Sequence, residues 1–211
     1  MGGYFQTTKT DAGWNYNVGK SAWNIDVLAY KEIAQLPTPI QDKFISDMAQ
    51  NRHFRDRYIE WAKYLMNTGY TNVAKEELTL TWLTPKIINK IKNDGFDLNS
   101  PIVVMQNTQI EHSYNDKTPK QKLTESEYLQ IYDIVNNPDE ILYDFTKYNK
   151  HSKALGLAFI RFISNSEKCI RVSARLNEPS NTKGRIMPVV RITTVAKIKY
   201  ASMGKFFKKI E

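Results

Sequence analysis

Two stretches near the C-terminal end alternate between apolar and polar side chains. In CIRVSARL (169–176), Ile170, Val172, Ala174 and Leu176 alternate with Arg171, Ser173 and Arg175. The stretch VVRITTVAKIKY (189–200) repeats the pattern, with Val190, Ile192, Ala196 and Ile198 against Arg191, Thr193, Lys197 and Lys199. Because successive side chains of a strand point to opposite faces, each stretch predicts a β-strand with one apolar face and one face rich in cations and hydroxyl groups.

The positive charge of the chain is concentrated around these two stretches. The formal net charge is +8, and residues 146–211 hold 15 Lys and Arg against 3 Asp and Glu, whereas residues 101–145 hold 3 against 8. Such a concentration of positive charge favours an anionic partner. Nucleic acid is the more favoured partner, because the sequence shows no amphipathic basic helix of the kind that binds a membrane surface. The alternative, a solvated face that aids solubility, stays open.

The size and composition set broad limits. With 211 residues and 41% hydrophobic content, the chain suits one large domain or two small ones with a substantial core. Cys169 is the sole cysteine, which excludes a disulfide or a cysteine-based zinc site within one chain. No apolar run approaches the roughly 18 residues of a membrane span, and no secretion signal is recognisable. We therefore expect a soluble, intracellular protein.

Start and stop signals divide the chain into a helical part and a strand-rich part. Residues 1–24 predict an extended arm that packs on the body through Trp14, Tyr16 and Trp23. Near residues 95–100 the sequence changes from helical to strand-rich patterns, which predicts a boundary between one region at 1–98 and another at 99–211. Helices are expected at 38–50, 55–67, 85–94 and 124–137, the last opened by a capping box of Thr124 and Glu127.

Short β-rich runs separated by polar turns follow the boundary. Strands are expected near 101–105, 140–145, 154–164, 169–176 and 187–199. Helices followed by successive strands with short connections predict an α+β fold, in which the N-terminal helical part packs on a C-terminal twisted antiparallel sheet of about four strands.

The sequence contains no recognised metal, nucleotide or nucleophile motif, so its three histidines are the main candidates for acid–base chemistry. His53 opens a helix and His151 lies in a polar loop, and both are expected at the surface. His112 precedes the predicted 124–137 helix and is either a packing residue or a functional one. Cleavage of RNA without a metal needs a base, an acid and a cation, whereas binding phosphate needs only cations and hydroxyl groups, so the two functions stay open.

Three segments resemble the C-terminal half of phage Mu F-like minor head, or head morphogenesis, proteins. They are GWNYNVGKSAW (13–23), IVVMQNTQIEHS (102–113) and LTESEYLQIYDIVNNPDEILYD (123–144). In that family a C-terminal module is similar to the phage group of the barnase–EndoU–colicin–RelE superfamily, with a helix, a twisted four-stranded antiparallel sheet and predicted metal-independent ribonuclease activity. The head-assembly domain that usually comes first is not in this sequence, so we expect a fragment of a longer head protein or a stand-alone module.

The resemblance implies a site. It assigns catalysis to His112, with Arg171, Thr193 and Thr194 steadying the phosphorane, and no metal or cofactor. We expect RNA or DNA on the exposed sheet face, in steeply salt-dependent contact with further cations, namely Arg161, Arg175, Arg191 and Lys197. The predicted function is a phage-encoded metal-independent nuclease of the ribonuclease type, with use as a toxin left open. The alternative is a non-catalytic nucleic-acid-binding or structural component of head assembly. Partners would include phage head or portal proteins, in the bacterial cytoplasm and the virion.

Overall fold

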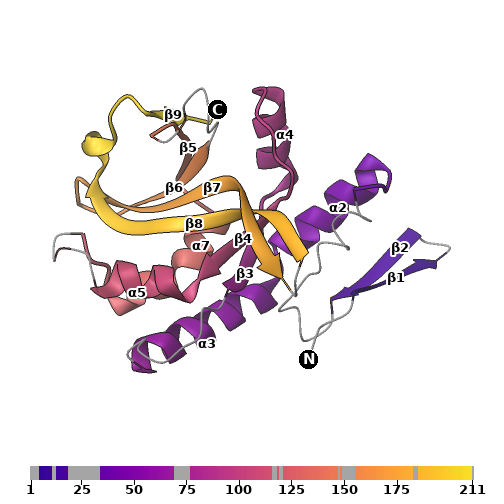
Figure 1. The fold of residues 1–211 in the computed structure, drawn as a ribbon, viewed down its shortest axis with the longest axis horizontal. Helices are drawn as coiled ribbons and strands as arrows, with labels where there is room; N and C mark the ends of the chain where they lie inside the picture. Colours follow the sequence, from indigo (N-terminus) through magenta and orange to yellow (C-terminus); the bar gives the residue numbers. More distant parts are fainter. Residues whose placement is uncertain are drawn as a thin grey trace.

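The computed structural model describes most of the chain after residue 33 and two short strands before it (Figure 1). The described residues are 5–10, 13–18, 34–68, 77–115, 118, 121–146, 148, 155–182 and 185–210. β1 (Phe5–Thr10) and β2 (Gly13–Val18) pair antiparallel in a sheet of their own, so part of the predicted extended arm is a pair of strands. The predicted packing of Trp14, Tyr16 and Trp23 falls on side chains outside the described part of the chain.

A seven-stranded sheet forms the body of the molecule. Its strands are β3 (Glu77–Trp82), β4 (Ile102–Gln106), β5 (Glu140–Asp144), β6 (Gly156–Phe162), β7 (Lys168–Thr182), β8 (Arg185–Lys199) and β9 (Phe207–Lys209), in the order β3-β4-β8-β7-β6-β5-β9. β4 and β8 run parallel, and the other neighbours run antiparallel. The predicted α+β class and the antiparallel neighbours β6, β7 and β8 are confirmed. The predicted antiparallel sheet of about four strands is wrong, because the sheet is larger and mixed.

Two of the helices, α4 (Pro85–Asn93) and α6 (Glu125–Leu129), begin where local capping chemistry predicts, whereas a helix at Asn107–Asn115 was not predicted. The helices are α2 (Thr38–Ala49), α3 (Arg52–Thr68), α4 (Pro85–Asn93), α5 (Asn107–Asn115), α6 (Glu125–Leu129) and α7 (Ile131–Asn136), followed by the 3₁₀ turn η2 (Tyr200–Met203). The Thr84 side chain accepts from the Ile87 amide at the start of α4, and Thr124 and Glu127 form the predicted capping box of α6. The helix expected at 124–137 is divided into α6 and α7 at Gln130.

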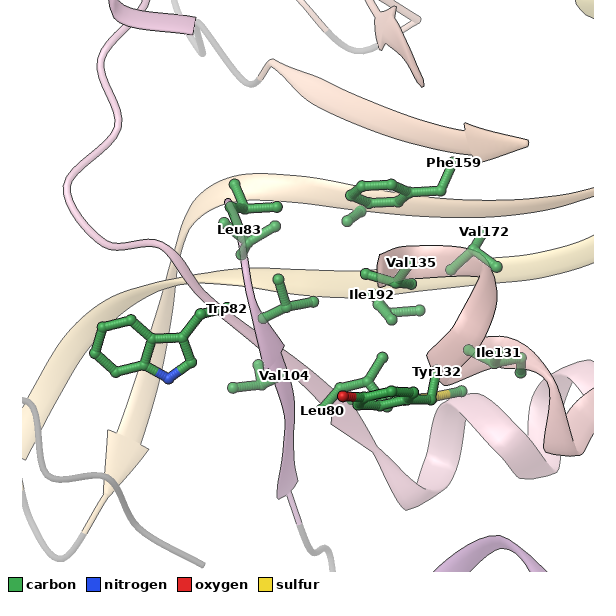
Figure 2. Close-up of a cluster of buried hydrophobic side chains, with 14 of the residues drawn as sticks. Leu80, Trp82, Leu83, Val104, Ile131, Tyr132, Val135, Phe159, Val172 and Ile192 are labelled. Atoms are coloured by element: carbon green, nitrogen blue, oxygen red, sulfur yellow. The ribbon is translucent and has the colours of Figure 1, made fainter. Parts of the chain in front are cut away.

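One hydrophobic core lies between the helices and one face of the sheet. Figure 2 shows Leu80 and Trp82 of β3 together with Tyr132 and other residues of α7, and Phe159 of β6 in the same cluster. Further members come from α3, whose buried side chains include Tyr58, Trp61, Ala62 and Leu65. The helical layer therefore covers one face of the sheet and leaves the other face for a site.

The core joins both sides of the expected boundary at residue 98. β3, from the N-terminal side, pairs with β4, from the C-terminal side, in one continuous sheet. Phe44 of α2 and Val195 of β8 belong to the same cluster of buried side chains. Whether residues 1–98 and 99–211 behave as separate units stays a prediction, which an unfolding experiment tests below.

The face of the sheet that the helices do not cover is called the open face here. Its far end carries a second, smaller apolar cluster, in which Met203 of η2 covers Ile160 and Cys169. Burial raises the pKa of the Cys169 thiol to about 11, so this cysteine is a packing residue at neutral pH. The predicted cationic face is thus partly apolar and covered by the C-terminal segment.

A β-bulge in β8 changes which side chains reach the open face. Ser173 pairs with Thr194 but Ala174 pairs with Ile192, so Thr193 is the extra residue. The predicted assignment of side chains to the two faces of the 187–199 strand is therefore wrong after Thr193. Val195 and Lys197 point toward the helices, whereas Ala196 and Ile198 lie on the open face, opposite Arg171 and Cys169 of β7. The alternation predicted for CIRVSARL is confirmed, with Ile170, Val172, Ala174 and Leu176 in the core.

Candidate phosphate-binding site on the open face

A cavity of about 280 Å³ opens on the open face where five strands meet. Its floor comes from β7 and β8 and its walls from the ends of β5, β6 and β9. The residues that line it are Asp144, Thr146, Gly156, Arg171, Ser173, Ala174, Arg175, Thr193, Thr194 and Phe207. Two guanidinium groups and several hydroxyl groups therefore converge in one recess, a composition suited to a phosphate group.

Arg171 provides the cation at the floor of the cavity. Its guanidinium carbon lies 5.6 Å from the centre of the Phe207 ring, within the range of a cation–π contact. Its Nε is buried and donates to no group in the described part of the protein. Burial lowers the pKa of Arg171 while the nearby Asp144 carboxylate acts in the opposite direction, and an arginine stays protonated at neutral pH in either case. The cavity thus holds a partly desolvated positive charge with an unused donor.

Hydroxyl groups surround this cation. Ser173 is only 5% exposed, and its Oγ has no hydrogen-bond partner among the described residues. Thr193, at the bulge, donates from its hydroxyl to the Ser173 carbonyl at 3.3 Å, and Thr194 lies directly opposite Ser173. A buried donor without a partner costs free energy unless a ligand or water supplies one. Ser173 and Arg171 both leave such a donor beside the cavity.

Asp144 is the carboxylate that the described residues bring to the cavity. Its Oδ1 accepts from the Thr146 amide at 2.9 Å and from the Thr146 hydroxyl at 2.6 Å. These bonds hold it at the end of β5, where it opposes part of the charge of Arg171. Asp144, Thr146 and Phe207 were missed by the sequence analysis, because only the pairing of β5 with β6 and β9 brings them to β7.

The structure brings together three of the four predicted catalytic residues. Arg171, Thr193 and Thr194 all line the cavity. The backbone of His112 belongs to α5, and Ile110 of the same helix is fully buried in the core on the helix-covered face of the sheet. The side chain of His112 lies outside the described part, as does the whole of His151, while His53 lies in the first turn of α3.

The four predicted nucleic-acid-binding cations do not form one surface. Arg175 lines the cavity and lies 3.8 Å from Glu178, and Arg191 contacts Glu77 at 3.1 Å and Glu178 at 3.6 Å. Arg161 and Lys197 point to the helix-covered side. Arg161 donates to the Asn137 carbonyl and lies 3.7 Å from Asp139, and Lys197 contacts Glu127 at 2.7 Å. Each of the four therefore has a carboxylate partner, and only Arg175 shares the cavity with Arg171.

A larger cavity, of about 720 Å³, lies among the helices, but its charges are balanced. Arg55 pairs with Asp133 at 3.0 Å across it. The Tyr132 hydroxyl donates to the Asn51 carbonyl at 3.1 Å, and burial raises the pKa of this tyrosine to about 12. Its lining holds two arginines and two aspartates, so this cavity attracts an anion less than the open-face cavity does.

The described residues show neither a metal cluster nor a membrane helix. Across the described ranges, no group of three or more His, Cys, Asp or Glu side chains is placed to hold a metal ion. No helix in that part of the chain is long and apolar enough to cross a membrane.

The chain is similar to a curated phage protein. It is 27% identical over 142 residues to the Mu-like prophage FluMu F protein of Haemophilus influenzae, a match that covers 64% of this chain. The matched region spans 34%, about a third, of that longer protein. No protein-family model matches the sequence, and no solved structure matches it. The similarity supports the resemblance to phage Mu F-like proteins.

Proposed function

We propose that the protein is a non-catalytic component of a Mu-like phage head that binds the phosphate backbone of nucleic acid in its open-face cavity. The head assignment rests on the similarity to a Mu-like prophage F protein and on the minor head family that segments 13–23, 102–113 and 123–144 resemble. The match covers about a third of that relative. A head role for this chain is therefore a proposal.

The observation that carries the binding proposal is a pair of unused donors on two residues that line the cavity. The Arg171 Nε and the Ser173 Oγ are both buried without a partner in the described structure, and Arg175 and Thr194 line the same recess. A phosphodiester oxygen would satisfy these donors and balance the charge of Arg171. Most protein contacts to nucleic acid go to phosphate oxygens and carry no sequence information, so binding would depend little on base sequence.

Fluorescence anisotropy with labelled RNA and DNA tests this binding over a series of salt concentrations. We expect affinity to fall as salt rises, with a slope of about one for each phosphate contacted, because the cations of the protein displace counterions condensed on the nucleic acid. Arg171→Met keeps the apolar stem against Phe207 and removes the charge, and it should weaken binding of all sequences and reduce the salt slope by about 1. Arg55→Met, which removes a cation from the helical layer, is the matched control and should bind like the natural protein. Absence of binding at low salt, or equal loss in both variants, would overturn the proposal.

A metal-independent ribonuclease is the second candidate, because Arg171, Thr193 and Thr194 line one cavity. Within the described residues, Asp144 is the acid–base group that lies with them, since α5, which carries His112, packs on the opposite face. The labelled RNA of the binding experiment, incubated in EDTA and run on a denaturing gel, separates the two candidates. Intact RNA supports the binding role, whereas cleavage that His112→Ala and Arg171→Met both abolish would replace it with the nuclease.

A further inference from the structure

The C-terminal segment carries an exposed aromatic residue directly beside a residue that lines the open-face cavity. Phe207 lines the cavity, and the preceding residue, Phe206, is 51% exposed. The carbonyl of Phe206 accepts from the Phe145 amide at 2.9 Å, and Phe145 lies between Asp144 and Thr146, which both line the cavity. The backbone of Phe206 therefore lies next to three residues that line the cavity, namely Asp144, Thr146 and Phe207.

Cations accompany this ring. The Lys205 ammonium lies 5.7 Å from the centre of the Phe206 ring, and the Arg171 guanidinium lies 5.6 Å from the centre of Phe207. Two adjacent aromatic rings thus each have a cation beside them. A large exposed apolar side chain next to cations and a phosphate-sized recess is the combination that proteins use to bind single strands, with stacking on the ring and charge along the backbone.

We propose that the open-face cavity binds single-stranded rather than duplex nucleic acid, with a phosphate beside Arg171 and Ser173 and the neighbouring base stacked on Phe206. This inference rests on the proposed function and specifies its ligand. In a duplex the bases are paired and stacked on one another, so they offer no face to Phe206, and only the phosphate contacts remain. A single strand can present both groups at once, which makes the aromatic ring useful for that form alone.

The test compares three probes of about 12 nucleotides, a length within the range that small single-strand-binding folds cover. The probes are a single strand, the same strand with abasic residues that keep every phosphate, and the duplex. We expect the unsubstituted 211-residue chain to bind the single strand most tightly. Phe206→Ala should weaken single-strand binding about 5- to 100-fold and leave binding of the abasic strand unchanged, since only the stacked base is lost.

Tyr64→Ala is the matched control, because Tyr64 is 56% exposed on α3 in the helical layer, and it should change nothing. Phe206→Leu keeps an apolar side chain without a ring and should behave like Phe206→Ala. If the abasic strand or the duplex binds as tightly as the single strand, or if Phe206→Ala binds normally, the stacking proposal is wrong while phosphate binding stands. If no probe binds, both the proposed function and this inference are wrong.

Discussion

Glu127 joins a helix start to the sheet through one carboxylate. Its Oε2 accepts from the Thr124 amide at 2.7 Å in the capping box, and its Oε1 contacts the Lys197 ammonium at 2.7 Å. Burial raises the pKa of Glu127, but the bonds with Lys197 and Thr124 outweigh it, so its pKa lies below the ordinary 4.5. The charged form is therefore favoured by folding.

Glu127→Gln should lower the free energy of unfolding by about 1–2 kcal/mol at neutral pH, since it weakens the cap and leaves Lys197 without its carboxylate. A depressed folded-state pKa gives stability that is present above the ordinary pKa of 4.5 and is lost as pH falls through the folded-state pKa. Urea denaturation at pH 7 and at about pH 3.5 should therefore show a gap between the two proteins that narrows in acid. Glu125→Gln, which changes an exposed carboxylate of the same turn, is the control. A gap of equal size at both pH values would contradict this account.

The starts of α4 and α6 were predicted because their signals are local, whereas α5 (Asn107–Asn115) was omitted. Thr84 and Thr124 cap helices within a few residues of themselves, so the sequence alone locates those starts. β3 was omitted although Leu78, Leu80 and Trp82 alternate with threonines, and β9, with 3 residues, is too short to give a pattern. The face on which each β8 side chain after Thr193 lies is set by the bulge at Thr193, and this bulge is a property of the pairing of β8 with β7. Arg171 and Thr193 were predictable because they lie on the polar side of the expected strands, and Thr194 follows Thr193. Asp144 and Phe207 were not, because only the pairing of β5 with β6 and β9 brings them to the cavity.

The pairing of β6 with β7 depends on a glycine. A Cβ on Gly156 would lie 2.8 Å from the Ala174 carbonyl oxygen, closer than real side chains come to a backbone oxygen. Gly156→Ala should therefore force the strands apart and lower the free energy of unfolding by about 1–3 kcal/mol, as overpacking of a core does. The midpoint of urea denaturation measures this effect. An unchanged midpoint would show that β6 can shift at no cost.

The molecule as a whole is held by one core that spans the expected boundary at residue 98. β3 and β4 pair across that boundary, and the buried cluster runs from Phe44 to Val195. Since residues 1–98 and 99–211 both contribute to this core, we expect the sheet and helices to unfold in one cooperative transition. Circular dichroism and tryptophan fluorescence followed through a urea series should then give coincident curves. Two separated transitions would instead support independent regions at 1–98 and 99–211.

The parallel contact of β4 with β8 also sets the order of events during synthesis. Val103 pairs with Val190 and Val104 with Arg191, so one edge of β4 has no strand beside it until translation has passed residue 191. At roughly 5–20 residues per second, ribosomes take several seconds to cover that interval. During this interval, the free edge of β4 exposes unpaired amide and carbonyl groups, next to apolar side chains that the finished fold buries. Exposed strand edges of this kind promote aggregation of nascent chains. Native folding of this protein is therefore expected to be slow and completed after the last strands are made.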